Sequence, residues 1–413
     1  MFRKLLTYDE AKKAIEQHLN LKPLGVEEIP LLEAYDRVLA EDAISTLDIP
    51  PFNRSTVDGF AVKAEDTYGA EENQPVKLRV CGNVPIGELP KVAVAKGEAA
   101  EIVTGAPVPE GADAVVMVED THRQDSEVLV YSSVTKNENV QKKGSDIKNG
   151  EIILKAGQTL GSREIGVLAA LGKSKIQVYK VPTVAVLSTG GEVTEPGCEL
   201  PPGKIYDINA YSLSIAVRES GGKPVYAGVV PDEKAELQKA LEQALASADM
   251  VLTSGGVSVG PKDIVPATVG SLGAPGLIFS GIALKPGKPV TLGLIGEKPI
   301  FSFPGHPTSA LLTFHLLARP VIQVMAGKTP REMGSVEAYA GKRMFSAKGR
   351  RTFVTVKLNR DELKRLVAEP VETGASGAIT TLAKADGFVE IPENQQFVDV
   401  DEKVTVWLFK ETL

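Results

Sequence analysis

The stretch from Val251 to Asp263, VLTSGGVSVGPKD, joins an apolar run to a loop of glycines and hydroxyl side chains. A buried strand that feeds such a loop exposes a row of backbone N–H groups, which is how α/β folds bind anions at a sheet edge. Asp263 is placed to hold a hydrated Mg²⁺ beside that anion. The loop lacks the GK[ST] ending of a P-loop and the spacing of a GxGxxG turn, so a flexible connection is an equal alternative. The candidate binding residues are Ser254, Gly255, Gly256 and Ser258.

Two further loops are expected at the same sheet edge, because each follows a predicted strand of one α/β domain. The loop STGGE covers residues 188–192, and Asp232 follows the strand PVYAGVV. Carboxylates beside anion-binding amides repel one another unless a cation joins them, so Glu192, Asp232 and Asp263 are candidate Mg²⁺ ligands. Asp232 also opens a predicted helix, and an N-cap role is compatible with facing a ligand. The anion-binding residues of the STGGE loop are Thr189 and Gly190.

Two proline-containing loops predict a second, separate anion site. LKPGKP places Lys285 and Lys288 three residues apart, and each is followed by a proline that restricts the backbone. Solvated lysines are the common interpretation of such a pair, but a stiff turn favours fixed donors. PGHPTS precedes a helix, with Ser309 near its start, and helix N-termini bind anions through free N–H groups.

A polar cluster follows a Pro-Pro pair in the segment LDIPPFNRSTVDGFAV, residues 47–62. Asp58 and Gly59 form a turn, for which a plain surface role is the simplest explanation. A rigid arm that carries polar side chains is also how an active-site loop is presented. Thr104 lies in a second tight loop, TGAP.

The elements that must position these residues follow from the periodicity. A T-x-x-E capping box at Thr7 starts a helix over 7–19, and a second helix is expected over 30–40. Residues 70–145 break into short alternating segments, which indicates a small β domain. From residue 183, where TVAVLST is a buried strand, strands alternate with helices, which predicts a parallel sheet. The end of the chain is again rich in strands.

The predicted fold is therefore a multidomain α/β and β protein. It has an N-terminal helical segment, an inserted small β domain, a central α/β domain with a parallel sheet, and a small C-terminal β domain. The predicted parts are residues 1–48 with 142–178, 49–141, 179–327 and 328–413.

Composition limits the class of protein. A net charge of −7 argues against a nucleic-acid partner, so an anionic ligand must be held by local groups. Two cysteines exclude a disulfide framework and fit a reducing compartment. The sequence has no run of 18 apolar residues and no signal-peptide core at its start, so we expect a cytoplasmic protein without a membrane span.

Several stretches, in this order, resemble the MoeA family, whose eukaryotic relative is the E domain of gephyrin. They are PPFNRSTVDGFAV, IVTGAPVPEGADAVV, GSDI, STGGEV, GKIYDIN, TSGGVSVGPKD, LKPGKP and FPGHPTSA, and they span residues 49–325. The resemblance implies a homodimeric molybdopterin molybdenumtransferase, with a small barrel as its last domain. Such an enzyme inserts molybdate into adenylylated molybdopterin, releases AMP and forms molybdenum cofactor. The first anion site would hold the pterin phosphate and AMP with Mg²⁺, and the second site would hold molybdate.

The resemblance also implies roles for single residues. The matched acids and the TGAP threonine imply a catalytic group of Asp58, Thr104, Asp146, Glu192, Asp232 and Asp263. The matched binding residues of the other loops are Lys285, Lys288, Pro289, Pro304, Pro307, Ser309, Arg350 and Ser376. The chain departs from the family pattern at Gly191, where an acid is common, and at His306, where an asparagine is common.

Two other functions fit parts of the pattern. A molybdopterin adenylyltransferase shares the α/β domain but does not need the inserted β domain, and such an enzyme is also the expected partner that supplies the substrate. A scaffold like the gephyrin E domain needs a peptide-binding surface, which no stretch specifies. Molybdate and tungstate have nearly the same size and charge, so both remain candidate substrates.

Overall fold

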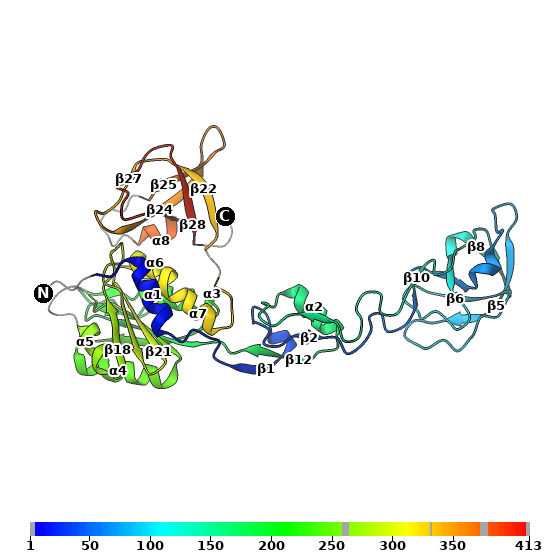
Figure 1. Ribbon diagram of the computed structural model, residues 1–413, viewed down its shortest axis with the longest axis horizontal. Coiled ribbons are helices and arrows are strands. Elements are labelled where there is room, and N and C mark those ends of the chain that lie inside the picture. The colour runs from blue at the N-terminus through cyan, green and yellow to red at the C-terminus, as the bar shows by residue number, and fades with distance from the viewer. Residues whose placement is uncertain (1–4, 258–263, 331–332, 372–378, 410–413) are drawn as a thin grey trace. The chain divides into compact units, whose positions relative to one another are not determined.

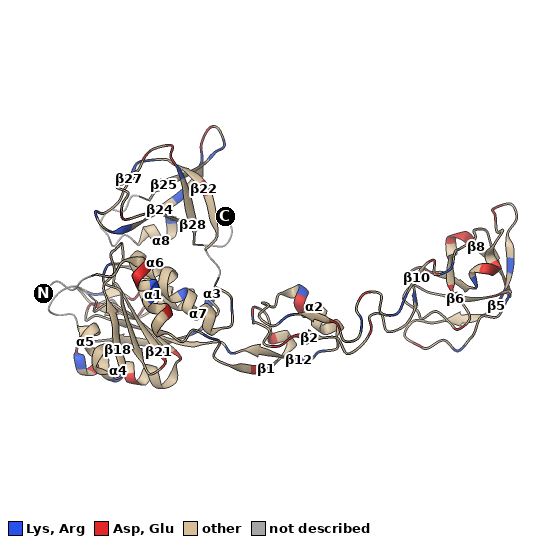
Figure 2. Cartoon of the chain, in the orientation of Figure 1, with Lys and Arg blue, Asp and Glu red and all other residues tan. Residues whose placement is uncertain are grey.

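The computed structural model describes residues 5–257, 264–330, 333–371 and 379–409. Contacts divide the chain into two compact units (Figure 1). The first contains residues 1–40, 157–161 and 175–413, and the second contains residues 41–156 and 162–174. The predicted division into four parts stays a prediction. Figure 2 shows acidic and basic residues mixed in both units.

The first unit begins with helix α1 (Tyr8–His18), which confirms the helix predicted from the capping box. The Thr7 side chain accepts from the N–H of Glu10, and the Glu10 carboxylate accepts from the N–H of Thr7. These bonds satisfy two amides that the helix leaves without partners. Tyr8, Ala11 and Ile15 are buried, so α1 packs through one face.

The helix predicted over 30–40 is wrong. Strand β1 (Val26–Pro30) pairs with β12 (Lys175–Tyr179), and only a 3₁₀ turn, η1 (Leu31–Glu33), follows it. Asp36 has a positive φ of 60° and donates its N–H to Leu160 O, so the chain turns away where a helix would continue.

A six-stranded sheet forms the centre of this unit. Four adjacent strands pair in parallel, and the fifth strand in the order pairs antiparallel with both of its neighbours, so the predicted parallel sheet is corrected to a mixed one. The antiparallel strands are joined by short connections rather than by the helical crossovers that parallel strands need. In spatial order the strands are β16 (Lys223–Val230), β13 (Thr183–Thr189), β17 (Met250–Ser254), β21 (Lys298–Phe303), β20 (Thr291–Ile295) and β18 (Pro275–Ser280).

Helices cover both faces of this sheet (Figure 1). Alternate residues of β13 point to opposite faces, as the pleat requires: Val184 and Val186 belong to one core, Ala185 and Leu187 to the other. On the first face α1 packs with α3 (Asn209–Glu219), α6 (Pro307–Thr313), the π-helical turn η4 (Phe314–Ala318) and α7 (Arg319–Met325). On the second face lie α4 (Lys234–Ser247) and α5 (Ile264–Ser271). A short pair, β14 (Val193–Thr194) with β15 (Ile205–Tyr206), stands beyond β13.

The C-terminal part is a closed barrel. Strands pair in the circular order β24, β25, β22, β28, β26 and back to β24, which leaves no open edge in that ring. The barrel strands are β22 (Ser335–Ala340), β24 (Arg351–Arg360), β25 (Leu366–Pro370), β26 (Gly387–Ile391) and β28 (Lys403–Leu408). The additional elements are β19 (Leu284–Lys285), β23 (Met344–Phe345), β27 (Phe397–Val398) and α8 (Thr380–Lys384).

The second unit contains the predicted β domain. Its sheet has the order β7, β4, β6, β5, β9, β8. The strands are β4 (Gly59–Val62), β5 (Val76–Val84), β6 (Glu98–Ile102), β7 (Ala114–Met117), β8 (Thr121–Gln124) and β9 (Glu127–Val130). The other elements are β2 (Ala43–Ile44), β3 (Arg54–Ser55), β10 (Val140–Gln141), β11 (Ile152–Leu154), α2 (Ser162–Ala170), η2 (Ala64–Thr67) and η3 (Val118–Asp120).

Candidate active site

A cavity of about 940 Å³ lies at the carboxyl ends of β13, β17 and β21 in the first unit. This is the edge of an α/β sheet where ligands are expected. The predicted site residues that line it are Thr189, Glu192, Ser254, Gly255, Gly256, Pro289, Pro304 and Pro307. Gly190 stands in the same loop as two of them. The structure thus brings both glycine-rich loops and two proline-containing loops to one cavity.

The glycines after β17 are required by close approach to the neighbouring loop. Gly255 has φ 93° and Gly256 has φ 63°, which side-chain-bearing residues rarely adopt. A Cβ atom on Gly255 would lie 2.2 Å from the carbonyl oxygen of Thr189, and one on Gly256 would lie 2.7 Å from Val265 Cγ2. The chain after β17 can therefore pack against β13 and α5 only with glycine at these positions.

Two buried polar residues that the sequence-based assignment missed complete the cavity wall. Asp207 Oδ1 accepts from the hydroxyl of Ser188 at 2.9 Å and from the N–H of Ala210 at 3.0 Å. The Asn209 amide donates to Ser254 Oγ at 2.6 Å and to Gly305 O at 2.8 Å. Both residues belong to the GKIYDIN stretch, but a polar pair before a helix looks like an ordinary cap, so only packing shows that they face a cavity.

The three carboxylates predicted to bind Mg²⁺ are not brought together in the described part of the chain. Glu192 lines the cavity, whereas Asp232 is exposed and does not line it. The N-cap role of Asp232 is wrong, because α4 has Glu233 at its N-cap and no side-chain capping bond there. No group of three possible metal-ligating residues occurs among the described residues. Three predicted site residues lie outside the described residues: Ser258, Asp263 and Ser376.

The LKPGKP loop is held between the α/β domain and the barrel. Lys285 pairs with Thr352 through β19 and β24, which places this lysine beside the turn that contains Arg350. A Cβ on Gly287 would lie 2.3 Å from Thr313 Cγ2, so the loop also packs on α6. Lys288 precedes Pro289, and Ser309 is buried in the first turn of α6. The arrangement gathers positive charge from two lysines on one loop.

The second unit holds the remaining predicted residues. Asp58 Oδ1 accepts from the N–H of Thr104 at 2.6 Å and from its hydroxyl at 2.8 Å. These bonds, the amide first, hold the pKa of Asp58 below its ordinary value. A Cβ on Gly59 would lie 1.8 Å from Val116 O, so β4 can pair with β7 here only with glycine next to Asp58. Asp146 is exposed and donates its N–H to Ile49 O.

Comparison with known proteins accounts for nearly the whole chain. Residues 6–172 match the model of the MoeA N-terminal region (domains I and II), residues 185–324 match a probable molybdopterin binding domain, and residues 337–409 match the MoeA C-terminal region (domain IV). The molybdopterin molybdenumtransferase of Haemophilus influenzae is 33% identical over 99% of this chain and 100% of its own length. The chain belongs to the MoeA family.

Other relatives agree with this assignment. Molybdopterin molybdenumtransferase 2 of Mycobacterium tuberculosis is 34% identical over 92% of the MoeA-family chain and 94% of its own length. The crystal structure of a molybdopterin biosynthesis MoeA protein from Pyrococcus horikoshii has a TM-score of 0.87 and 42% identity. That match covers 98% of this chain and 100% of the other.

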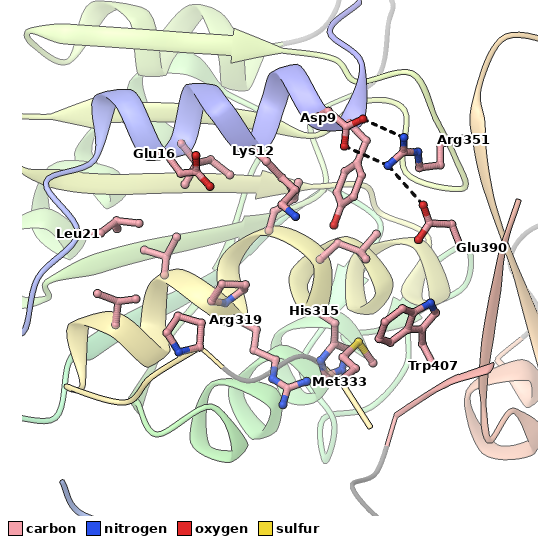
Figure 3. Close-up of a pocket in the computed structure, with 18 of the residues that line it drawn as sticks. Asp9, Lys12, Glu16, Leu21, His315, Arg319, Met333, Arg351, Glu390 and Trp407 are labelled. Carbon is pink, nitrogen blue, oxygen red and sulfur yellow. Dashed lines mark hydrogen bonds and ion pairs between the residues drawn. The ribbon is translucent and has the colours of Figure 1, made fainter. Parts of the chain in front are cut away.

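A second cavity of about 500 Å³ in the MoeA-family chain lies among α1, the π-helical turn, α7 and the barrel (Figure 3). At its rim Arg351 forms ion pairs with Asp9 at 2.9 Å and Glu390 at 3.3 Å. Burial, and next the charge of Glu390, raise the pKa of Tyr8 to about 12. His315 is buried, which lowers its pKa to about 4, with Arg319 as the second cause, so this histidine is neutral at pH 7.

Among the described residues, no helix is both long enough and apolar enough to cross a membrane.

Proposed function

We propose that this protein is a molybdopterin molybdenumtransferase that inserts molybdate into adenylylated molybdopterin, releasing AMP and forming molybdenum cofactor. The observation that carries the proposal is the cavity at the carboxyl edge of β13, β17 and β21, where both glycine-rich loops converge in a chain of the MoeA family. Backbone amides in such loops suit the phosphates of the nucleotide, because they donate hydrogen bonds without bringing side-chain bulk.

Molybdate is assigned to the second site. It is a dianion that must lose oxide to accept two thiolates, so nearby positive charge stabilises both the bound oxyanion and the departing oxide. We assign this charge to Lys285, Lys288 and Arg350, supported by the β19–β24 pairing that places Lys285 beside the turn of Arg350. Ser309, Pro304 and Pro307 shape the adjoining helix start.

The donors present suit Mg²⁺, which commonly binds through one or two carboxylates together with substrate phosphate oxygens. The exposed carboxylate of Glu192 on the cavity wall is such a donor, and Asp263 is the second in the proposal. When bound there, the ion would offset the charge of the phosphoanhydride. Asp232 follows a strand of the same sheet but does not line the cavity, so the proposal gives it no role in binding Mg²⁺.

Asp58, Thr104 and Asp146 form the third part of the proposal. The two bonds from Thr104 keep Asp58 ionised, so this residue can attract a cation during the reaction. We propose a homodimer in the cytoplasm, supplied with substrate by a molybdopterin adenylyltransferase. Mixing inactive Asp58→Asn and Glu192→Gln proteins tests the use of Asp58: recovered activity assigns Asp58 to the partner subunit, and none assigns it to its own chain.

One incubation tests the function. The purified protein with adenylylated molybdopterin should release AMP only when molybdate is added, and molybdenum cofactor should form in equal amount. Pyrophosphate release from molybdopterin and ATP without molybdate would instead identify an adenylyltransferase. Absence of both reactions would leave the scaffold function. Repeating the assay with limiting tungstate decides which oxyanion the protein prefers.

A further inference from the structure

Among the described residues that line the cavity, Asp207 and Asn209 carry the only two buried side-chain oxygens that have no hydrogen-bond partner. Asp207 is 3% exposed and Asn209 is 8% exposed. Asp207 Oδ2 and Asn209 Oδ1 are the unpartnered atoms. A buried acceptor without a partner is unfavourable, so this wall is suited to a ligand that brings hydrogen-bond donors.

The hydrogen bonds of the other polar atom in each of these two side chains determine the chemistry of the wall. The Asn209 amide nitrogen donates to Ser254 Oγ and Gly305 O, so the oxygen must be the remaining atom of that group. Asp207 Oδ1 already accepts from Ser188 and Ala210. Both remaining atoms are therefore acceptors, and one belongs to a carboxylate. A phosphate or an oxyanion would be repelled here, whereas a neutral group with several N–H donors would be attracted.

Resting on the proposed function, we propose that Asp207 and Asn209 recognise the pterin ring of the substrate. The pyrimidinone edge of a pterin presents two adjacent donors, the 2-amino group and N3–H, which match two acceptors. An adenine edge offers only its 6-amino group. The apolar residues Val193, Val257 and Ile379 also line the cavity and suit a flat ring. Because the Asp207 carboxylate repels phosphate, the substrate should bind with its pterin ring at Asp207 and its phosphates at the glycine-rich loops.

Binding on this wall includes a side-chain adjustment, because both oxygens are covered in this structure. Asp207 and Asn209 lie on either side of Ile208 at the start of α3. Their hydrogen bonds to Ser188 and Ser254 connect this turn to the carboxyl ends of β13 and β17.

The test is a change of preference between two probes in the full-length protein. 6-Methylpterin carries the 2-amino donor, and 6-methyllumazine carries a carbonyl acceptor at the same position. The unmodified protein should bind 6-methylpterin about tenfold more tightly, measured by quenching of the probe's own fluorescence. In Asp207→Asn the amide oxygen must keep accepting from Ser188 and Ala210, so an NH₂ group replaces Oδ2. The preference should then reverse toward the lumazine.

Controls separate recognition from folding. Asp249→Asn is matched, because Asp249 Oδ2 also accepts from a backbone N–H, that of Thr183, at the start of β13, away from the cavity. It should keep the preference of the unmodified protein. Equal weakening of both probes in Asp207→Asn, or an unchanged preference, would overturn the proposal. The proposal would also be overturned if Asp207→Asn abolished the binding of Mg²⁺ alone and left the preference for 6-methylpterin over 6-methyllumazine unchanged. Molybdate-dependent AMP release by the unmodified protein is measured separately, so failure of the pterin assignment leaves that result intact.

Discussion

Replacing Arg351 by methionine should destabilise the barrel and its contact with α1. The Arg351 side chain is 16% exposed and pairs with Asp9 at 2.9 Å, Glu390 at 3.3 Å and Glu393 at 3.2 Å. Its guanidinium also lies 5.2 Å from the centre of the Tyr8 ring. Methionine keeps much of the apolar stem and removes the charge. The variant therefore leaves three carboxylates close together without their common cation.

The loss of unfolding free energy in Arg351→Met should lie between two limits. Breaking an exposed ion pair costs about 0–1 kcal/mol, and removing one partner of a buried pair costs about 3–5 kcal/mol. Glu390 and Glu393 are 31% and 28% exposed, whereas Asp9 is 60% exposed and can be rehydrated. We expect the free energy of unfolding to fall by about 2 kcal/mol at pH 7. Most of this loss should come from the two less exposed carboxylates, which lose their cation.

The loss should depend on pH. Burial raises the pKa of Glu390, and Arg351 opposes this shift. A carboxyl with a raised pKa contributes stability when protonated, and that contribution is lost as pH rises through its folded pKa. Without Arg351 the pKa of Glu390 rises further, so the variant loses most at pH 7. The difference from the unmodified protein should shrink as the pH is lowered from 7 toward about 4.

The chain provides its own probe for this measurement. Its single tryptophan, Trp407, lines the same cavity as Arg351 (Figure 3), so its fluorescence reports urea unfolding of this region. Arg343→Met is a matched control, because Arg343 pairs with Asp399 at 3.0 Å with both side chains about half exposed. A loss in Arg351→Met no larger than in Arg343→Met, or one independent of pH, would refute the reasoning.

Three further predictions concern the proposed site. Thr104→Val removes the hydroxyl donor but keeps the amide, so the pKa of Asp58 should rise and still remain below its ordinary value; carboxyl NMR titration measures this, and an unchanged pKa contradicts it. Gly255→Ala places a Cβ 2.2 Å from Thr189 O at a positive φ, so it should cost about 2 kcal/mol or more in urea unfolding and abolish nucleotide binding; retained binding would disprove the close-approach argument. Lys285→Ala should raise the molybdate concentration needed for AMP release more than it weakens pterin binding, and equal losses would count against two separate sites.

Local rules in the sequence determined much of this protein. The helix at Tyr8–His18 follows from its own capping residues, and the strand Thr183–Thr189 follows from an unbroken apolar run. Glycines after an apolar strand permit a positive φ, and Gly255 and Gly256 adopt one. These features depend on residues next to one another in the chain, so their signals are complete in a short stretch.

Only the tertiary structure decided which distant residues meet. Asp207 and Asn209 look like cap residues in the sequence, and packing of the start of α3 against the carboxyl ends of β13 and β17 turns them into a cavity wall. The antiparallel course of β18 and β20, and the pairing of Lys285 with the barrel, likewise depend on partners remote in sequence. Hydrogen bonds between strands and ion pairs such as Arg351 with Asp9 form only once the chain has packed, so no short stretch carries a signal for them.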